Sequence, residues 1–246
     1  MSAADARIYA QEYKLNREGG APVESLAKRV EGWMHHQVAN LAGAGDVLEL
    51  GAGTLNHLAH EPQSSRQNYD IVEPFDALYK SSPRLNAIRN VYGRLSDVPD
   101  GQKYDRIISV AVLEHLTDLP VEMALAALKL KPGGVMQAGI PSQGGFLWWL
   151  GWRCTTGISY WLRTRLDYGQ IMRHEHVNTA PEILAVVGHI FSDVRVRRFP
   201  LPFHMLSLYA YLEAREPDLA RCTAILAAAR SRAFSDHCRS YPAAAK

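Results

Sequence analysis

Residues 46–54 decide the fold of this chain; they read Asp-Val-Leu-Glu-Leu-Gly-Ala-Gly-Thr. The apolar residues predict a short buried strand, and the strand is followed by a Gly-x-Gly turn. Because glycine has no Cβ atom, the backbone at Gly51 and Gly53 can approach a bound ligand closely. The segment therefore predicts a site for a nucleotide-like cofactor at the end of a strand.

A second apolar strand with a carboxylate at its end follows. Residues 69–74 read Tyr-Asp-Ile-Val-Glu-Pro, and Glu73 lies twenty residues after Gly53. An acidic residue at about this spacing can accept hydrogen bonds from ribose hydroxyls. Since the carboxyl ends of parallel strands share one edge of a sheet, Glu49 and Glu73 are expected to border the same site.

The glycine pattern does not fit a dinucleotide cofactor well. The third glycine of the Gly-x-Gly-x-x-Gly fingerprint would fall at Asn56, and the carboxylate of Glu49 would repel a pyrophosphate. An NAD(P)-dependent oxidoreductase therefore stays only as a minor alternative.

The acidic-x-Gly-x-Gly pattern resembles the first motif of the Rossmann-like (class I) S-adenosylmethionine (SAM)-dependent methyltransferase superfamily, nearest to its small-molecule and ubiquinone-type group. Residues 103–116 look like the family's fourth strand with its Leu-Glu-His-Leu segment, and residues 130–134 look like the turn before strand five, 135–140. The resemblance implies SAM as the cofactor. It also implies an α/β fold: a doubly wound, seven-stranded, mostly parallel sheet with an antiparallel C-terminal hairpin and helices on both faces.

The resemblance assigns roles to residues at the cofactor. It places Glu49 near the methionine amino group and Glu73 on the ribose. The expected cofactor-binding residues are Glu49, Gly51, Ala52, Gly53, Thr54, Glu73, Pro74, Leu95 and Ala111.

Two positions depart from the family pattern. A further glycine that is common in the superfamily is replaced by Leu55, which predicts a bulkier loop. The Gly-Asp that often follows strand three, here residues 88–92, is replaced by Gly93-Arg94-Leu95. Leu95 can still cover the adenine ring. The amino group of the adenine would then be bound by a backbone carbonyl or by Asp97.

Apolar spacing predicts the remaining elements. Helices are expected at residues 25–41, 120–130 and 219–234, and a capping box at 179–182 predicts the start of another. Two strand-like runs, at 193–199 and 206–212, are expected to form the C-terminal hairpin. We expect one methyltransferase domain over residues 1–246, with a frayed tail at 235–246.

Residues 143–177 are the least family-like segment and are predicted to cover the acceptor substrate. Aromatic rings stack on planar or sugar rings, and guanidinium groups bind phosphate or carboxylate. The expected acceptor-binding residues are Trp148, Trp149, Trp152, Tyr160, Arg163, Arg165, Tyr168 and Arg173. Two other interpretations stay open: an apolar helix face packed on the sheet, and a peripheral membrane patch for a lipid-linked substrate.

Methyl transfer to a hydroxyl requires removal of a proton, and histidine is a suitable base near neutral pH. The candidates are His115, His174 and His176, with His57 as a weaker fourth. The alternative role for each is to bind a backbone carbonyl and order a loop.

No metal is predicted. Ubiquinone-type relatives have Glu-x-x-Glu-His at the end of strand four, which can support a divalent cation. Here the first position is Ala111, so the motif retains only Glu114 and His115. Two ligands are too few without further partners.

Composition limits the functional class. The formal net charge of +2 does not favour nucleic-acid binding, and the three cysteines show no metal-type pairing. No signal-peptide pattern opens the sequence, and the longest apolar stretch, residues 144–152, is far shorter than the ~20 residues that span a bilayer. A cytoplasmic protein without a transmembrane segment is expected.

Together these observations predict a SAM-dependent methyltransferase. The predicted acceptor is a small-molecule or carrier-linked hydroxyl, on a glycan, a nucleotide sugar or a phenol, and the transfer is in line with a histidine base. The main alternative is a catalytically inactive, methyltransferase-like binding or scaffold protein.

Overall fold

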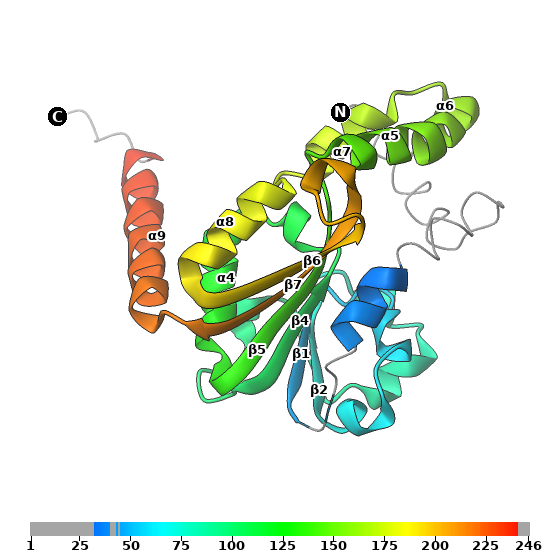
Figure 1. Cartoon of the computed structure of the whole chain (residues 1–246). Helices are drawn as coiled ribbons and strands as arrows, with labels where there is room; N and C mark the ends of the chain where they lie inside the picture. Colours follow the sequence, from blue (N-terminus) through cyan, green and yellow to red (C-terminus); the bar gives the residue numbers. More distant parts are fainter. Residues whose placement is uncertain (1–31, 40–42, 44, 241–246) are drawn as a thin grey trace. The chain divides into compact units, whose positions relative to one another are not determined.

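The computed structural model describes residues 32–39, 43 and 45–240. The chain divides into two compact units, residues 1–33 and 34–246, and nearly all described residues belong to the second. Its centre is a seven-stranded sheet with the strand order β3-β2-β1-β4-β5-β7-β6 (Figure 1). The strands are β1 (Val47–Leu50), β2 (Tyr69–Val72), β3 (Asn90–Tyr92), β4 (Tyr104–Val110), β5 (Leu130–Pro141), β6 (Phe191–Pro200) and β7 (Ser207–Pro217).

The sheet is parallel from β3 to β5 and antiparallel at its β7–β6 end. Val47 of β1 pairs with Tyr69 of β2 and with Arg106 of β4, both in parallel register. β7 runs antiparallel to both of its neighbours, β5 and β6. This topology confirms the predicted methyltransferase-type fold, and it puts the reversal of strand order between β1 and β4, where open α/β sheets bind ligands.

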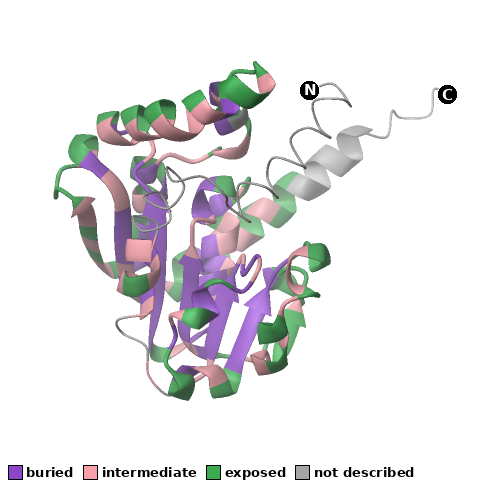
Figure 2. Ribbon diagram, turned by 90° about the vertical axis from the view of Figure 1, so that its right-hand side faces the viewer, coloured by how far each residue is buried: buried purple, intermediate pink, exposed green. Residues whose placement is uncertain are grey.

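The helices are α3 (Asp76–Tyr79), α4 (Leu119–Leu128), α5 (Phe146–Trp152), α6 (Ile158–Thr164), α7 (Tyr168–Glu175), α8 (Ala180–Ile190) and α9 (Leu219–Ser240). Helices α4 and α8 bury apolar residues such as Met123, Ile183 and Val187 in one core with the sheet (Figure 2). The predicted capping box opens α8, since the Glu182 carboxylate accepts hydrogen bonds from the Thr179 amide and hydroxyl at 2.7 Å each.

Residues 34–39, which are helical, pack on the opposite face of the sheet. The ideal Cβ position of Gly139 on β5 lies 2.7 Å from the Met34 Cβ, so the helix approaches β5 as closely as a glycine allows. Arg106 of β4 also donates to the Val38 carbonyl at 3.1 Å. Helices therefore cover both faces, as predicted. Only residues 32–39 of the helix predicted at 25–41 are described. The rest of that predicted helix, and residues 1–24 of the predicted single domain, lie outside the described residues.

Several element bounds differ from the predicted ones. β3 begins at Asn90 instead of residue 88, because Ile88 closes the preceding turn with a bond to the Leu85 carbonyl. β5 includes the predicted turn at residues 130–134, since Leu130 already pairs with Tyr104 before a register shift. α9 continues to Ser240, beyond the end predicted at residue 234 and into the tail from residue 235; residues 241–246 are not described.

The segment between β5 and α8 is helical. It comprises α5, a π-helical turn at Arg153–Gly157, α6 and α7. Among the described residues, no helix combines the length and the apolar character that crossing a bilayer requires.

Candidate active site

The glycine turn after β1 holds a backbone conformation that needs glycine. Gly51 has φ +67°, and its amide donates to the Val72 carbonyl at 2.8 Å, which ties the turn to β2. A Cβ atom at Gly51 would lie 2.4 Å from Val112 Cγ2. Val112 follows β4, so the absence of a side chain at Gly51 lets the ends of β1 and β4 approach each other.

Glu73 holds the other side of this turn. Its carboxylate is buried and accepts from the Gly53 amide at 2.8 Å and from the Phe75 amide at 3.0 Å. Each carboxylate oxygen has a second lone pair, so a ribose hydroxyl can still donate to it. The position predicted for the ribose contact therefore lies directly at the glycine turn.

Leu55, at the position where the family pattern often has a glycine, adopts a left-handed backbone conformation. It has φ +62°, in the left-handed region, and its amide donates to the Ala52 carbonyl at 2.9 Å. Its side chain is fully buried. The sequence predicted a bulkier loop, but it did not predict that the Leu55 side chain is buried while its backbone is strained.

Glu49 is a buried carboxyl at the end of β1. It accepts a hydrogen bond from the Tyr69 hydroxyl at 2.9 Å. Burial raises the pKa of Glu49 to about 7, because the charged form is poorly solvated. A cationic group bound beside Glu49 would favour its ionised form.

Three other predicted cofactor residues, Pro74, Leu95 and Ala111, come after the ends of β2, β3 and β4. Leu95 is buried in the turn after β3, and Pro74 is exposed directly after Glu73. Ala111 follows β4 with φ +54° and donates to the Gly139 carbonyl at 2.8 Å. Asp97, the candidate for the adenine amino group, accepts from the Arg94 amide at 2.9 Å.

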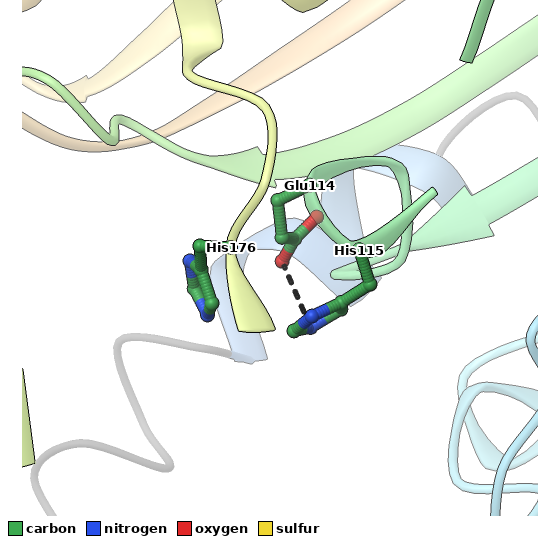
Figure 3. Close-up of side chains that lie close together, drawn as sticks. All are labelled: Glu114, His115 and His176. Atoms are coloured by element: carbon green, nitrogen blue, oxygen red, sulfur yellow. Dashed lines mark ion pairs between the residues drawn. The ribbon is translucent and has the colours of Figure 1, made fainter. Parts of the chain in front are cut away.

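Three side chains gather after β4: Glu114, His115 and His176 (Figure 3). His115 Nε2 lies 3.9 Å from Glu114 Oε1, and the rings of His115 and His176 meet edge to face with centroids 4.8 Å apart. Glu114 is buried, and the His115 side chain is 40% exposed. The fold thus joins two of the three predicted base candidates and adds a carboxylate.

Residues 175–178 are held to the turn at Leu113–His115 by hydrogen bonds. The amides of Val177 and Asn178 donate to the Glu114 carbonyl at 2.9 and 3.1 Å. The Asn178 side chain donates to the carbonyls of Leu113 and Leu116 at 2.9 and 2.7 Å. These bonds fix His176 beside His115, although the two residues are about sixty positions apart in the sequence.

Both histidines of the cluster have an acceptor at Nδ1. His115 Nδ1 donates to the Glu175 carbonyl at 2.9 Å, and His176 Nδ1 bonds to the amide oxygen of Gln143. Burial, with a smaller contribution from the nearby His115, lowers the pKa of His176 to about 4. His176 is therefore neutral at physiological pH.

The other two base candidates lie elsewhere. His174 is exposed in the last turn of α7 and is not part of the cluster. His57 is buried, with its Nε2 2.9 Å from Glu61 Oε1 and its Nδ1 3.0 Å from His35 Nδ1. His57 thus belongs to a polar network inside the protein, because its hydrogen-bonding capacity is used there.

The helical segment after β5 contains a cavity of about 440 Å³. Of the predicted acceptor-binding residues, Trp148, Trp149, Trp152 and Arg173 line it, and Arg153 lines it as well. Gln143 and Trp148 connect this cavity to the cluster: Gln143 bonds His176, and the Trp148 ring stacks near His176 at 6.5 Å.

The other four predicted acceptor residues do not line this cavity. Tyr160 is buried and packs on Tyr168 with centroids 5.3 Å apart, inside the helical segment. Arg165 lies over the Trp161 ring at 4.6 Å, and Arg163 donates to the Ser159 hydroxyl at 2.6 Å. The contacts of Tyr160 and Tyr168 therefore fit a role in packing the helical segment better than a role in binding the acceptor.

Residues 24–175, more than half of the sequence, match the family described as methyltransferase domain. The chain belongs to this methyltransferase family. It is therefore a SAM-dependent methyltransferase of the general kind, and the oxidoreductase alternative is set aside. The sequence has no match among the curated proteins with which it was compared.

Solved structures share the fold of this methyltransferase. The CurJ carbon methyltransferase is 19% identical over 75% of this chain and 54% of its own, with a TM-score of 0.50. A SAM-dependent methyltransferase from Thermotoga maritima is 15% identical over 77% and 90%, with a TM-score of 0.51. The N-methyltransferase NodS from Bradyrhizobium japonicum is 13% identical over 75% and 94%, with a TM-score of 0.50. The chain thus spans about half of the CurJ structure, and at these identities the similarity shows the fold alone.

The sites of the methyltransferase fit its cofactor. Gly51 and Gly53 permit a close approach, Glu73 puts a carboxylate at the turn, and Glu49 adds a buried carboxyl. These features suit a ligand with a ribose and a cationic end.

Sequence reasoning missed the part played by Glu114, Gln143 and Asn178. For Asn178 a local signal existed, since it directly follows the Arg-His-Glu-His-Val segment, but its partners lie in a distant turn.

Proposed function

We propose that this methyltransferase transfers the methyl group of SAM to a hydroxyl of a small or carrier-linked acceptor, either a glycan or nucleotide sugar or a phenol. The observation that carries the proposal is the cluster of Glu114, His115 and His176 just beyond β4, the strand beside the glycine turn. A hydroxyl must lose its proton on methylation, and an imidazole at this place can accept it.

His115 is the proposed base. Its Nδ1 donates to the Glu175 carbonyl, so the lone pair is on Nε2, the nitrogen nearest Glu114. When His115 Nε2 takes the hydroxyl proton, the imidazolium is stabilised by the Glu114 carboxylate 3.9 Å away. The bound cofactor supplies a methyl group on a sulfonium, which an oxygen nucleophile held in line can accept.

The cavity beside the cluster supports an acceptor with a ring and an anionic group. Trp148 and Trp152 offer aromatic faces, and Arg153 and Arg173 offer guanidinium groups at the cavity wall. This combination suits the sugar and phosphate of a nucleotide sugar better than a free phenol, which lacks the anion.

An activity assay with methyl-labelled SAM tests the proposal. UDP-glucose, a neutral oligosaccharide and catechol serve as hydroxyl acceptors, and histamine serves as an amine acceptor, because solved structures with this fold include an N-methyltransferase. We expect labelling of a hydroxyl acceptor, with His115→Gln lowering kcat on the order of 10²–10⁴-fold at little change in the KM for SAM. Labelling of histamine alone, or full kcat in His115→Gln, would overturn the proposal.

A further inference from the structure

The glycine turn after β1 is not followed by an α-helix. In Rossmann-like folds the turn leads into a helix that packs on the sheet and so fixes the position of the turn. Here residues 51–68, all of which are described, contain only two short 3₁₀ helices, His57–Ala59 and Gln63–Asn68, before β2 begins. Other contacts must therefore hold the turn in place.

On the side of β2, backbone amides hold the turn. The Gly51 amide donates to the Val72 carbonyl at 2.8 Å, and the Gly53 amide donates to the Glu73 carboxylate at 2.8 Å. On the side of β4 and β5 the connection is made by side chains. It begins at His57, which follows the turn closely and is only 1% exposed.

A buried ion pair holds the His57 ring. His57 Nε2 donates to the Glu61 carboxylate at 2.9 Å, and the Arg106 guanidinium donates to both oxygens of that carboxylate at 3.0 and 3.1 Å. Although burial opposes ionisation, the hydrogen bonds from His57 and Arg106 lower the pKa of Glu61 to about 2. Glu61 is therefore ionised at physiological pH, and an ionised carboxylate can only accept.

The network continues to β5 and to the helix on the same face of the sheet. Arg106 also donates to the Gln137 side-chain oxygen on β5 at 2.9 Å and to the Val38 carbonyl at 3.1 Å. His57 Nδ1 lies 3.0 Å from His35 Nδ1, so one ring donates to the other. The segment after the glycine turn is thus joined to two strands and one helix through buried polar side chains.

The network also lies near the carboxyl that is predicted to meet the methionine amino group. Burial is the main cause of the raised pKa of Glu49, and His57 and Glu61 are near enough to influence it as well. The buried network therefore extends from the helix to the predicted cofactor site.

We propose that His57, Glu61 and Arg106 are positioning residues for SAM, which hold the glycine turn in its binding conformation in place of a helix. None of the three needs to touch the cofactor. The affinity for a ligand falls in proportion to the fraction of molecules in the binding-competent conformation, so loss of the network weakens SAM binding. The proposal goes beyond the proposed function, because it applies to any acceptor.

Calorimetric titration of the full chain with SAM and with S-adenosylhomocysteine tests the positioning proposal. His57→Leu removes the donor to Glu61, and we expect it to bind both ligands roughly ten- to hundredfold more weakly. His57→Gln keeps an N–H donor for Glu61 and should recover most of the affinity. Hydrogen exchange of the Gly53 and Leu55 amides should be faster in His57→Leu, and bound SAM should slow it again.

Tyr104→Phe is the matched control, because it also removes a buried hydrogen bond. The Tyr104 hydroxyl donates to the buried Asp70 carboxylate at 2.8 Å, at the start of β4 and away from the glycine turn. Urea denaturation should show that Tyr104→Phe and His57→Leu are both destabilised. Only His57→Leu should lose affinity for SAM, and circular dichroism verifies the fold of each variant.

Three results would overturn the positioning proposal. Wild-type affinity in folded His57→Leu would show that the buried side chains of Leu55 and Leu58 hold the turn by themselves. An equal loss of affinity in Tyr104→Phe would show that binding merely follows stability. An affinity in His57→Gln as low as in His57→Leu would exclude the bond to Glu61 as the cause.

A second variant keeps the test decisive if His57→Leu does not fold. Glu61→Gln preserves the shape of the side chain and removes the charge that His57 and Arg106 bind, and the same loss of SAM affinity is expected. Wild-type affinity in this variant would also overturn the positioning proposal. The titrations need no acceptor, so their outcome is independent of the labelling assay that tests the proposed function.

Discussion

Gly51 is the residue through which the cofactor turn and the end of β4 depend on each other. A methyl group there would meet Val112 Cγ2 at 2.4 Å, and its φ of +67° is unfavourable for any residue with a Cβ. We predict that Gly51→Ala lowers the free energy of unfolding by about 2–4 kcal/mol, from backbone strain and overpacking combined. Urea denaturation measures this value.

The double variant Gly51→Ala/Val112→Ala separates the two causes. Removal of the Val112 methyls takes away the two closest contacts, at 2.4 and 2.8 Å, and leaves the backbone strain with the Val112 Cβ at 3.1 Å. Relative to Val112→Ala alone, the added alanine should then cost only about 1–2 kcal/mol. An equal cost in both backgrounds would show that the contact with Val112 is unimportant.

Glu49 links cofactor binding to pH. In the free protein its pKa is about 7, and the methionine amino group, which the resemblance predicts beside it, would favour the ionised carboxylate. Binding therefore releases protons, so the affinity for SAM should increase as the pH rises towards about 7 and then level off. Calorimetry near pH 6.5 in buffers of different ionisation enthalpy measures the proton release, and Glu49→Gln should abolish the Glu49 contribution. Proton uptake in the wild type would contradict this position for Glu49.

At the level of elements, the segment 175–178 does more than connect α7 to α8. Its backbone and the Asn178 side chain bind carbonyls of the turn after β4, and this brings His176 to His115. The position of the cluster therefore depends on one loop docking on another, and Asn178 is the positioning residue between them.

We predict that Asn178→Ala leaves the carbonyls of Leu113 and Leu116 without this donor and costs about 1–3 kcal/mol of unfolding free energy. Hydrogen exchange of the Val177 and Asn178 amides should also become faster, because their docking on Glu114 is weakened. Exposed His174→Ala serves as the control and should change neither quantity. Unchanged exchange in Asn178→Ala would mean that the backbone bonds alone hold the segment.

For the whole molecule, the half-buried His176 contributes to acid sensitivity. Its pKa is about 4 in the folded protein, against an ordinary value of 6.5. Between these pH values the unfolded chain binds more protons, so the free energy of unfolding falls as the pH drops from about 6.5 to about 4. The expected loss from His176 is on the order of 1–3 kcal/mol, allowing for partial solvent screening.

The difference between wild type and His176→Gln isolates this contribution. His35 also lowers the free energy of unfolding in acid, because its pKa is lowered to about 3, chiefly by burial. Glu49 has a raised pKa and therefore increases the free energy of unfolding as the pH falls. Urea denaturation at pH 7.5 and pH 5 should show a smaller acid loss in the variant. Equal losses in both proteins would exclude His176 as a contributor.

Cofactor binding should stabilise the methyltransferase as a unit. At a SAM concentration of about 100 Kd, the gain is about 2.7 kcal/mol, which raises the melting temperature of a domain of this size by roughly 5–11 °C. Glu73→Ala should weaken SAM binding about ten- to hundredfold and shrink this shift, since it removes the carboxylate at the glycine turn. The exposed carboxylate of Asp76 offers a control, and Asp76→Ala should keep the full shift.

The sequence by itself determined the elements whose signals are local. Apolar runs predicted the strands, the glycines predicted the turn, and Thr179 with Glu182 predicted the start of α8, while the arrangement of the strands in the sheet was implied by the resemblance to the methyltransferases. These features arise from hydrogen bonds and backbone preferences among neighbouring residues, so a single sequence carries them.

Only the tertiary structure decided which side chains meet. It joined His176 to Glu114 and His115 across about sixty residues, placed Tyr160 inside the helical segment and buried the side chain of Leu55 at a positive φ. Such contacts depend on how loops and helices pack against the sheet, and no periodicity along the chain encodes them. The prediction of no metal counted only Glu114 and His115, because His176 comes from a loop that lies close to them only in the folded protein.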